Sequence, residues 1–252
     1  MLFRRQDRKP PTPRAAEWIE LMLDDETLRV AVRRHPQARR LTLRVRAAAR
    51  DVTLTAPPHV PLAFAHDFVQ RHREWVRLRL VRLPQQVPFE PGSVIPLHGT
   101  PHRIVHCPGA RGTAWTAVNA EGEPVLCVAG EAPHMPRRVQ DHLKREARRA
   151  LAAAVRHYAA ALKVDVGRIT LRDTASRWGS CSAQGDLSFS WRLVMAPPVV
   201  LDYLAAHEVA HRLEMNHGPR FWRLVEQVCP ARREAEAWLR RHGSDLHRYG
   251  AE

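Results

Sequence analysis

The sequence predicts an α+β protein in which a β-rich antiparallel N-terminal part is followed by a mainly helical C-terminal part with one hairpin. Two patterns carry this prediction. Apolar and polar residues alternate through much of residues 28–54, as they do in half-buried strands. After Pro219, apolar residues recur at spacings of three and four, as on the buried face of a helix, at Phe221, Leu224, Val225 and Val228. With 252 residues, 44% of them hydrophobic, the chain can bury a substantial core.

The N-terminal half begins with residues 1–25, which are Pro-rich at their start and are expected to form a flexible basic tail. Three alternating runs then predict strands of an antiparallel sheet, at residues 28–32, 41–45 and 52–54. A helix is expected over residues 60–82. Its apolar residues on or near one face are Phe64, Phe68, Trp75, Leu78 and Val81. Turn-forming Gly and Pro residues punctuate residues 88–128, where further short strands are expected.

The C-terminal half begins with a long Ala- and Arg-rich helix over residues 136–162, because Pro136 suits a first helical turn. Two strands follow, at residues 169–173 and 187–193. Three more helices are expected, over residues 199–213, from Pro219 onward, and over 231–242 before Gly243. The chain is therefore expected to divide into the tail (1–25), a β-rich region with one helix (26–132) and a C-terminal domain (133–252).

The chain is strongly basic, with 40 Lys and Arg residues against 26 Asp and Glu residues and a formal net charge of +14. Part of the excess lies in residues 1–50, which carry 13 basic and 6 acidic side chains. Clustered arginines neutralise phosphates, so this basic N-terminal segment makes nucleic acid a candidate partner. Charge alone does not establish such a partner, because an Arg-rich composition raises the charge everywhere.

Other features exclude several classes of protein. No apolar run approaches the length of a membrane span, and we expect no membrane partner. The basic start lacks the apolar segment of a secretory signal. The four cysteines lack CxxC spacing and are too few for a disulfide scaffold. We therefore expect a cytoplasmic globular protein.

The strongest chemical signal is the segment His207-Glu208-Val209-Ala210-His211, an HExxH motif inside a predicted helix. Residues four apart lie one turn apart on the same helix face, so His207 and His211 can reach one cation. Zn²⁺ suits such nitrogen ligands. Glu208 lies about 100° further round the helix, outside the ligand set but within reach of a metal-bound water, where a general base belongs.

A catalytic zinc site needs a third protein ligand, and His217 is the best candidate. It lies in Asn216-His217-Gly218-Pro219, a turn that ends one helix and begins the next, so its side chain can fold back toward the first pair. Glu214 and Glu226 are the competing candidates, and neither has comparable turn residues around it. Tyr203, one turn before His207, can point toward the site, but core packing is the expected role.

Arg177 and Trp178 belong to an unusual Trp-Gly-Ser turn between two predicted strands, just before the motif helix. This turn has two interpretations. Trp178 can anchor a packed turn, or Arg177 and Trp178 can contact a bound peptide, since loops on a rigid scaffold often carry function. His98, His102 and His106 are also spaced by four, but they flank a hairpin-like turn and do not share a face.

Taken together, these segments resemble the YgjP-like zinc metallopeptidases, which are related to the SprT proteins. The segments that carry the resemblance are residues 176–182, 188–193, 196–198, 207–211 and 216–222. The likeness extends over about residues 28–242 and implies a small zincin-like metallopeptidase domain within residues 133–252. It also implies that His207, His211 and His217 bind zinc and that Glu208 is the base. At position 218 the family usually has serine. This chain has Gly218 instead, and in this it is similar to the SprT-like relatives.

The function expected from the residues and the resemblance is that of a zinc metalloendopeptidase. Its substrate is a protein or peptide, hydrolysed by a Zn-activated water with Glu208 as general base. An edge strand of the hairpin within residues 168–193 is expected to pair with extended substrate. The alternative is a nucleic-acid-associated protein, with either a structural zinc site or DNA-linked proteolysis of the SprT-like kind.

Overall fold

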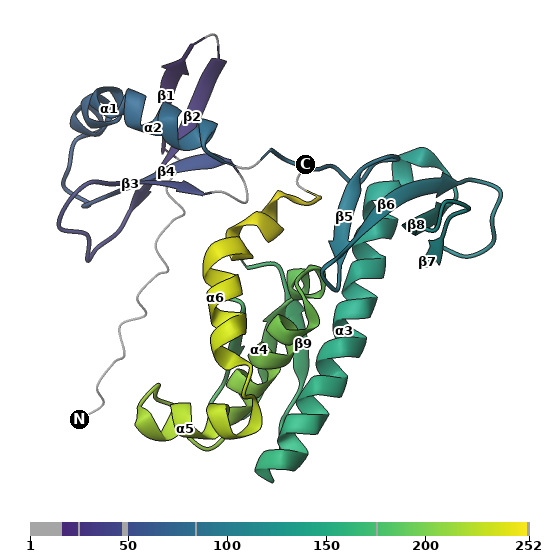
Figure 1. The fold of residues 1–252 in the computed structure, drawn as a ribbon. Helices are drawn as coiled ribbons and strands as arrows, with labels where there is room; N and C mark the ends of the chain where they lie inside the picture. The colour runs from purple at the N-terminus through teal and green to yellow at the C-terminus, as the bar shows by residue number, and fades with distance from the viewer. Residues whose placement is uncertain (1–16, 25, 47–49, 84, 175, 251–252) are drawn as a thin grey trace, which may run out of the picture. The chain divides into compact units, whose positions relative to one another are not determined.

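The computed structural model describes residues 17–24, 26–46, 50–83, 85–174 and 176–250 (Figure 1). The chain divides into two units, Met1–Leu83 and Pro84–Glu252, each with its own hydrophobic core. None of the helices within the described residues is both long enough and apolar enough to cross a membrane.

The first unit is a four-stranded sheet with two helices on one face. In spatial order its strands are β1 (Glu17–Leu23), β2 (Glu26–Arg34), β4 (Asp51–Ala56) and β3 (Thr42–Arg46). The helices are α1 (Leu62–Arg71) and α2 (Arg73–Val81). Every second strand residue faces the helices and is buried with them, which gives a core that includes Ile19, Leu21, Val30, Val52 and Leu54.

Three expectations for this unit are wrong. The sheet is not purely antiparallel, because β4 returns between β2 and β3 and so lies parallel to β2. The expected tail is too long at its C-terminal end, because residues 17–23 form β1 and bury Ile19 and Leu21 against the helices. Residues 1–16 lie outside the described residues.

The single helix expected over residues 60–82 is also wrong, because it is interrupted at His72. The buried face consists of Ala65, Val69 and Val76. The larger Phe64 and Trp75 side chains are instead 54% and 46% exposed. Small residues are used on the inner face because the helices lie close against the sheet.

The second unit begins with another four-stranded sheet and the longest helix. The sheet order is β5 (Val94–Leu97), β6 (Thr100–Cys107), β8 (Pro124–Ala129) and β7 (Ala114–Val118). Here too the central pair, β6 and β8, is parallel, contrary to the antiparallel expectation. The long helix is α3 (Met135–Leu162), preceded by a 3₁₀ turn at Ala132–His134. Its buried residues recur at spacings of three and four, as on one face of a helix.

A small sheet and three helices complete this unit. The sheet order is β10 (Gly179–Cys181), β11 (Leu187–Ser190) and β9 (Ile169–Arg172), so β10 is an edge strand. A 3₁₀ turn (Trp191–Met195) follows β11. The helices are α4 (Pro198–Ala210), α5 (Pro219–Val228) and α6 (Arg232–His242), and a second 3₁₀ turn (Gly243–Arg248) continues from α6.

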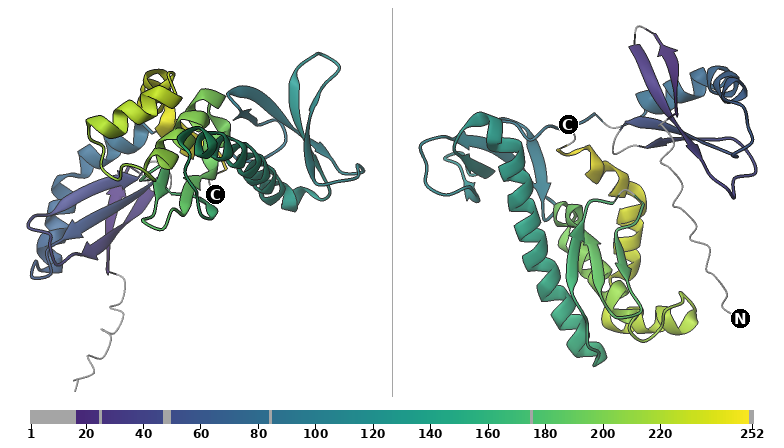
Figure 2. Two further views of the ribbon diagram at one scale, coloured as in Figure 1. Left: turned by 90° about the horizontal axis from the view of Figure 1, so that it is seen from below. Right: turned by 180° about the vertical axis from the view of Figure 1, so that it is seen from behind.

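Helix α4 lies at the centre of this unit. Figure 2 shows the long helix α3, in teal, beside the green and yellow helices of this unit. Helix α4 contacts α3 as well as α5, α6 and β10. Its buried residues therefore occur on all sides, as in other helices enclosed in a core. The strands β5 to β8 share this core through Ile95, Leu126 and Val128. The division between the units consequently falls at residues 83/84 rather than at the expected limit of 132/133.

Candidate metal centre

Three histidine side chains converge where α4 ends. His207 is on the last turn of α4, His211 directly follows that helix, and His217 lies in the turn before α5. One ligand atom from each lies within 4.8 Å of the others. The Nε2 atoms of His207 and His217 are 3.0 Å apart. Two nitrogens bound to one tetrahedral zinc lie about 3.3 Å apart, so the group fits such an ion with little adjustment.

The rings of two of these histidines are oriented by hydrogen bonds at Nδ1. The Nδ1 atom of His207 lies 3.2 Å from the hydroxyl of Tyr203, which donates at 2.9 Å to Oε1 of Glu236. The Nδ1 atom of His211 lies 3.0 Å from the carbonyl oxygen of Glu214. With its proton donated from Nδ1, each ring keeps an unprotonated Nε2 for a metal. Outer contacts of this kind are typical of metal-binding histidines.

The first turn of α5 forms an aromatic wall behind the cluster. Pro219 starts this helix, which brings Phe221 and Trp222 under the imidazole rings. The Phe221 ring is centred between 4.6 and 4.9 Å from all three histidine rings. Trp222 stacks on His217 at 5.6 Å, and the guanidinium of Arg232 covers Trp222 at 4.4 Å. This packing limits the positions that the histidine rings can take.

Burial sets the charge of the groups in the cluster. It lowers the pKa of His207 to about 3, with a further contribution from the neighbouring His211 and His217. Burial also lowers the pKa of His211. Both imidazoles are therefore neutral near pH 7, as metal ligands must be.

Glu208 is the buried carboxyl group next to this cluster. Its side chain is 4% exposed, and burial raises its pKa to about 7, against the opposing charge of Arg177. A carboxyl group with a pKa near the working pH can both accept and return a proton. Glu208 can therefore exchange protons with a substrate or water at this site.

Strand β10 passes close to Glu208, whose carboxyl group occupies the space where a side chain at position 179 would lie. A Cβ atom on Gly179 would lie 2.4 Å from Oε1 of Glu208, so a side chain at this position would force the carboxyl group or the strand to move. A hollow of about 470 Å³ opens beside this contact. Its lining residues are Trp178, Gly179, Tyr203, Leu204, His207, Glu208, Glu236, Leu239 and Arg240. One histidine of the cluster, His207, thus borders the same cavity as the carboxyl group of Glu208.

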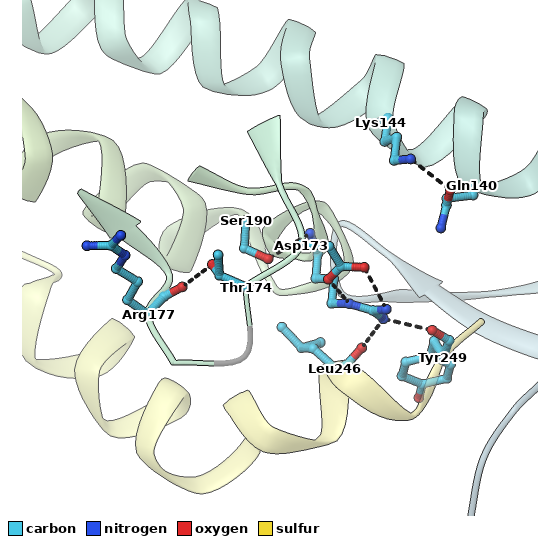
Figure 3. Close-up of polar contacts among 9 residues, drawn as sticks. Gln140, Lys144, Asp173, Thr174, Arg177, Ser190, Leu246 and Tyr249 are labelled. Atoms are coloured by element: carbon cyan, nitrogen blue, oxygen red, sulfur yellow. Dashed lines mark hydrogen bonds and ion pairs between the residues drawn. The ribbon is translucent and has the colours of Figure 1, made fainter. Parts of the chain in front are cut away.

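The turn that carries Arg177 and Trp178 is held at both ends. The buried guanidinium of Arg192 donates to both carboxylate oxygens of Asp173, at 2.7 and 3.1 Å, and to the carbonyls of Leu246 and Tyr249 (Figure 3). Figure 3 also shows the hydroxyl of Thr174 donating to the carbonyl of Arg177, at 2.8 Å. These contacts fix the start of β10 beside the hollow.

Trp178 and Arg177 occupy different positions in this turn. Trp178 is partly buried, stacks on His247 with centroids 5.2 Å apart, and lines the hollow. Arg177 is exposed, and its charge acts on Glu208. The ring of Trp178 therefore packs the turn and also borders the cavity, while its contact with a bound peptide stays a prediction.

The competing third ligands are directed elsewhere. The carboxylate of Glu214 lies 4.0 Å from Arg220, and that of Glu226 lies 3.0 Å from Arg232. Within the described part of the chain, the three histidines are the one group of three or more His, Cys, Asp or Glu side chains close enough to hold a metal ion. His106, by contrast, contacts the carbonyl of Gly130 at 2.5 Å.

Two residues of the site escape prediction from the sequence. Glu236 reaches Tyr203 from α6, and no local spacing relates these positions. The role of Gly179 is not predictable from the sequence, because it depends on the contact between Gly179 and the side chain of Glu208. Tyr203 is buried as expected, but its hydroxyl also contacts His207.

Comparison with known families decides the identity. The family described as YgjP-like, metallopeptidase domain, matches residues 39–242. The chain belongs to the YgjP-like family. The resemblance carried by the sequence motifs is thereby confirmed, and this YgjP-like chain contains a metallopeptidase domain. Family membership implies a divalent metal, and the three histidines could hold one. No curated protein and no solved structure shows a significant match.

Proposed function

We propose that this YgjP-like protein is a zinc-dependent endopeptidase in which His207, His211 and His217 hold the metal and Glu208 is the general base. The observation that carries this proposal is the convergence of three imidazoles, of which burial keeps His207 and His211 neutral, beside a buried carboxyl group with a pKa of about 7. Three nitrogen ligands with a cavity next to them are the donor set of a catalytic zinc site.

The chain's own residues have distinct tasks in peptide hydrolysis. Bound zinc would supply a Lewis acid and lower the pKa of a coordinated water. Glu208 accepts the proton that water loses as its oxygen attacks the scissile carbonyl. The same carboxyl group then delivers that proton to the leaving amine, so the base is regenerated. Burial of Glu208 supports this exchange because it raises the pKa into the neutral range.

The substrate is proposed to be an extended peptide that pairs with β10. This strand has one hydrogen-bonded neighbour, β11, so its other edge can pair with a further strand. Gly179 on β10 lies against Glu208, and this supports the proposal because a peptide paired with β10 would run close to that carboxyl group. Backbone pairing gives broad specificity and requires an unfolded or loop segment as substrate. Arg177 and Trp178 are proposed to contact this substrate at the start of the strand.

The structural zinc module is less well supported. A closed structural site uses four protein ligands, whereas three donors converge among the described residues. Cys181 is not part of this group, and burial raises the pKa of its thiol, which disfavours the thiolate that zinc binds.

The test of this function is the Glu208→Gln variant. We expect casein cleavage to fall about 10²–10⁴-fold, the usual contribution of a general base, while the protein keeps about one zinc per chain. Activity and zinc content are measured on the same preparations. Full activity in Glu208→Gln would overturn the assignment of the base, and wild-type protein that binds no zinc when it is supplied would overturn the function.

His217→Ala tests the third ligand separately. We expect it to lose zinc, because two imidazoles alone hold the ion weakly. Glu214→Gln and Glu226→Gln are the matched controls and should retain zinc at the wild-type level by elemental analysis. Zinc retained by His217→Ala but lost by either glutamine variant would move the third ligand to that glutamate.

A further inference from the structure

The first unit has an open sheet face opposite its helices. Residues whose side chains alternate with the buried core residues point to this face, and they include Thr42, Thr53, Thr55, Arg33 and Arg44. The register places Arg33, Thr55 and Thr42 in one row across β2, β4 and β3, and Ala31, Thr53 and Arg44 in the next. Small side chains thus form the floor, and arginines stand at its margins.

This face is hollowed at the end where β2 leads into β3. The hollow measures about 780 Å³. Its lining residues are Arg33, His35, Gln37, Ala38, Arg39, Arg40, Thr42, Arg44, Arg46, Thr53 and Thr55. The lining contains five arginines and no carboxylate. We refer to these lining residues as the basic hollow.

Most arginines of the basic hollow have no acidic partner. Arg46 pairs with Asp51, and Arg34, which points to the opposite face, pairs with Glu17 at 2.8 Å. Within the described residues, Arg33, Arg39, Arg40 and Arg44 form no ion pair, and all four are exposed. Like charges that lie close together without counter-charges raise the free energy of the folded chain. Binding of an external anion at the basic hollow would reduce this repulsion.

An aromatic side chain extends the same face. Trp18 on β1 pairs with Ala31, so it continues the row that runs through Thr53 to Arg44. The Trp18 side chain is 52% exposed. Exposed aromatic rings on a basic sheet are the platform on which unstacked bases rest, whereas a duplex keeps its bases stacked inside.

We propose that this open face binds single-stranded nucleic acid, with Arg33, Arg39, Arg40 and Arg44 contacting backbone phosphates and Trp18 stacking on a base. The threonine hydroxyls of the floor can donate to phosphate or sugar oxygens. An anionic membrane is the competing partner, and the basic hollow itself has no large apolar side chain to insert among lipids, so the membrane is tested directly with vesicles.

The test measures binding of fluorescein-labelled 20-nucleotide oligo(U) and oligo(dT) to the full chain by fluorescence anisotropy, over a series of KCl concentrations. The patch variant is Arg33→Gln/Arg40→Gln/Arg44→Gln. The matched control is Arg73→Gln/Arg79→Gln/Arg82→Gln, which removes the same charge from exposed arginines at α2 and its C-terminal end. Circular dichroism verifies that both variants fold. Residues 1–16 carry further basic side chains and stay unchanged in both.

We expect the patch variant to bind at least about tenfold more weakly, and the control to stay within about twofold of wild type. The slope of log K against log salt should fall by about 2 in the patch variant, since each phosphate contact to a single strand contributes about 0.7. Trp18→Ala should weaken binding by about fivefold or more without changing this slope, because stacking releases no counterions.

Several results would overturn the proposal. One is equal weakening by the patch and control variants, which would indicate attraction by net charge alone. Another is a 20-base-pair duplex bound as tightly as the single strands. Vesicles of phosphatidylserine bound more tightly than either oligonucleotide would point to a membrane instead. Whether RNA or DNA is the preferred form follows from comparing oligo(U) with oligo(dT).

Discussion

At the scale of single residues, the orientation of His207 depends on two hydrogen bonds in series. Its Nδ1 contacts the hydroxyl of Tyr203, and that hydroxyl donates to Glu236. Arg232 contacts Glu236 at 3.5 Å and Glu226 at 3.0 Å, so the acceptor is itself held in place. The position of His207, one of the proposed metal ligands on α4, is therefore determined in part by α6.

Tyr203→Phe tests this arrangement. Removing the hydroxyl leaves Nδ1–H of His207 without an acceptor, so we expect zinc affinity to fall about 10–100-fold, as for other outer contacts of metal ligands. Affinity is measured by competition with a chromophoric zinc chelator. Tyr158→Phe is the matched control, because Tyr158 is also buried and also donates to a carboxylate, that of Asp202. Unchanged zinc affinity in Tyr203→Phe would contradict the positioning role.

The sequence predicts the residues at this site that are related by helical spacing or by a turn. His207, Glu208 and His211 follow from the HExxH pattern, and His217 follows from the turn that returns the chain to them. Glu236 does not follow, because its contact with Tyr203 joins positions 33 residues apart. Such a contact depends on how helices pack, and periodicity carries no information about it.

At the scale of elements, the site depends on how closely β10 lies against α4. Helix α4 is enclosed on all sides, so Glu208 has no exposed face to occupy and instead fills the space left by Gly179. A residue without a Cβ atom lets the backbone of β10 come this close to the carboxyl group without displacing it. Gly179 thus sets how close β10, the strand proposed to pair with the substrate, lies to the proposed base Glu208.

Gly179→Ala tests this close approach. The added Cβ atom would lie 2.4 Å from Oε1 of Glu208, so strand or carboxyl group must move. We expect casein cleavage to fall by about 10²-fold, the effect of a displacement of roughly 1 Å, with zinc content retained. Gly218→Ala is the matched control, because a Cβ atom there has no neighbour within 4 Å. Equal activity of both variants would show that the contact is unimportant.

Elements are predictable from the sequence where local spacing alone decides them. The long helix is expected over residues 136–162 and is observed at Met135–Leu162, because its apolar residues repeat at helical spacing over many turns. The parallel pairing of β2 with β4 is not predictable in this way. Alternation identifies a strand, but it contains no information about which strand lies beside it.

At the scale of the whole molecule, the two proposed functions belong to different units. The three histidines and Glu208 lie within Pro84–Glu252, and the basic hollow lies within Met1–Leu83. Each unit has its own buried core. From the sequence, residues 84–132 are grouped with the first unit, because the residue pattern of a strand does not reveal which core the strand packs against. Only the shared core of β5, β8 and α3 assigns them to the second.

Separate cores lead to an expectation for the isolated second unit, residues 84–252. Because all the proposed ligands and the core around α4 are contained in it, this fragment should fold, bind about one zinc per chain and cleave casein within about threefold of the full chain. It should lose the oligonucleotide binding of the full chain, and residues 1–83 should retain that binding. Circular dichroism, elemental analysis and anisotropy on the same fragments provide the measurements. A folded second unit that fails to bind zinc would show that the metal centre needs the first unit, whereas oligonucleotide binding by the second unit alone would place the nucleic-acid surface elsewhere.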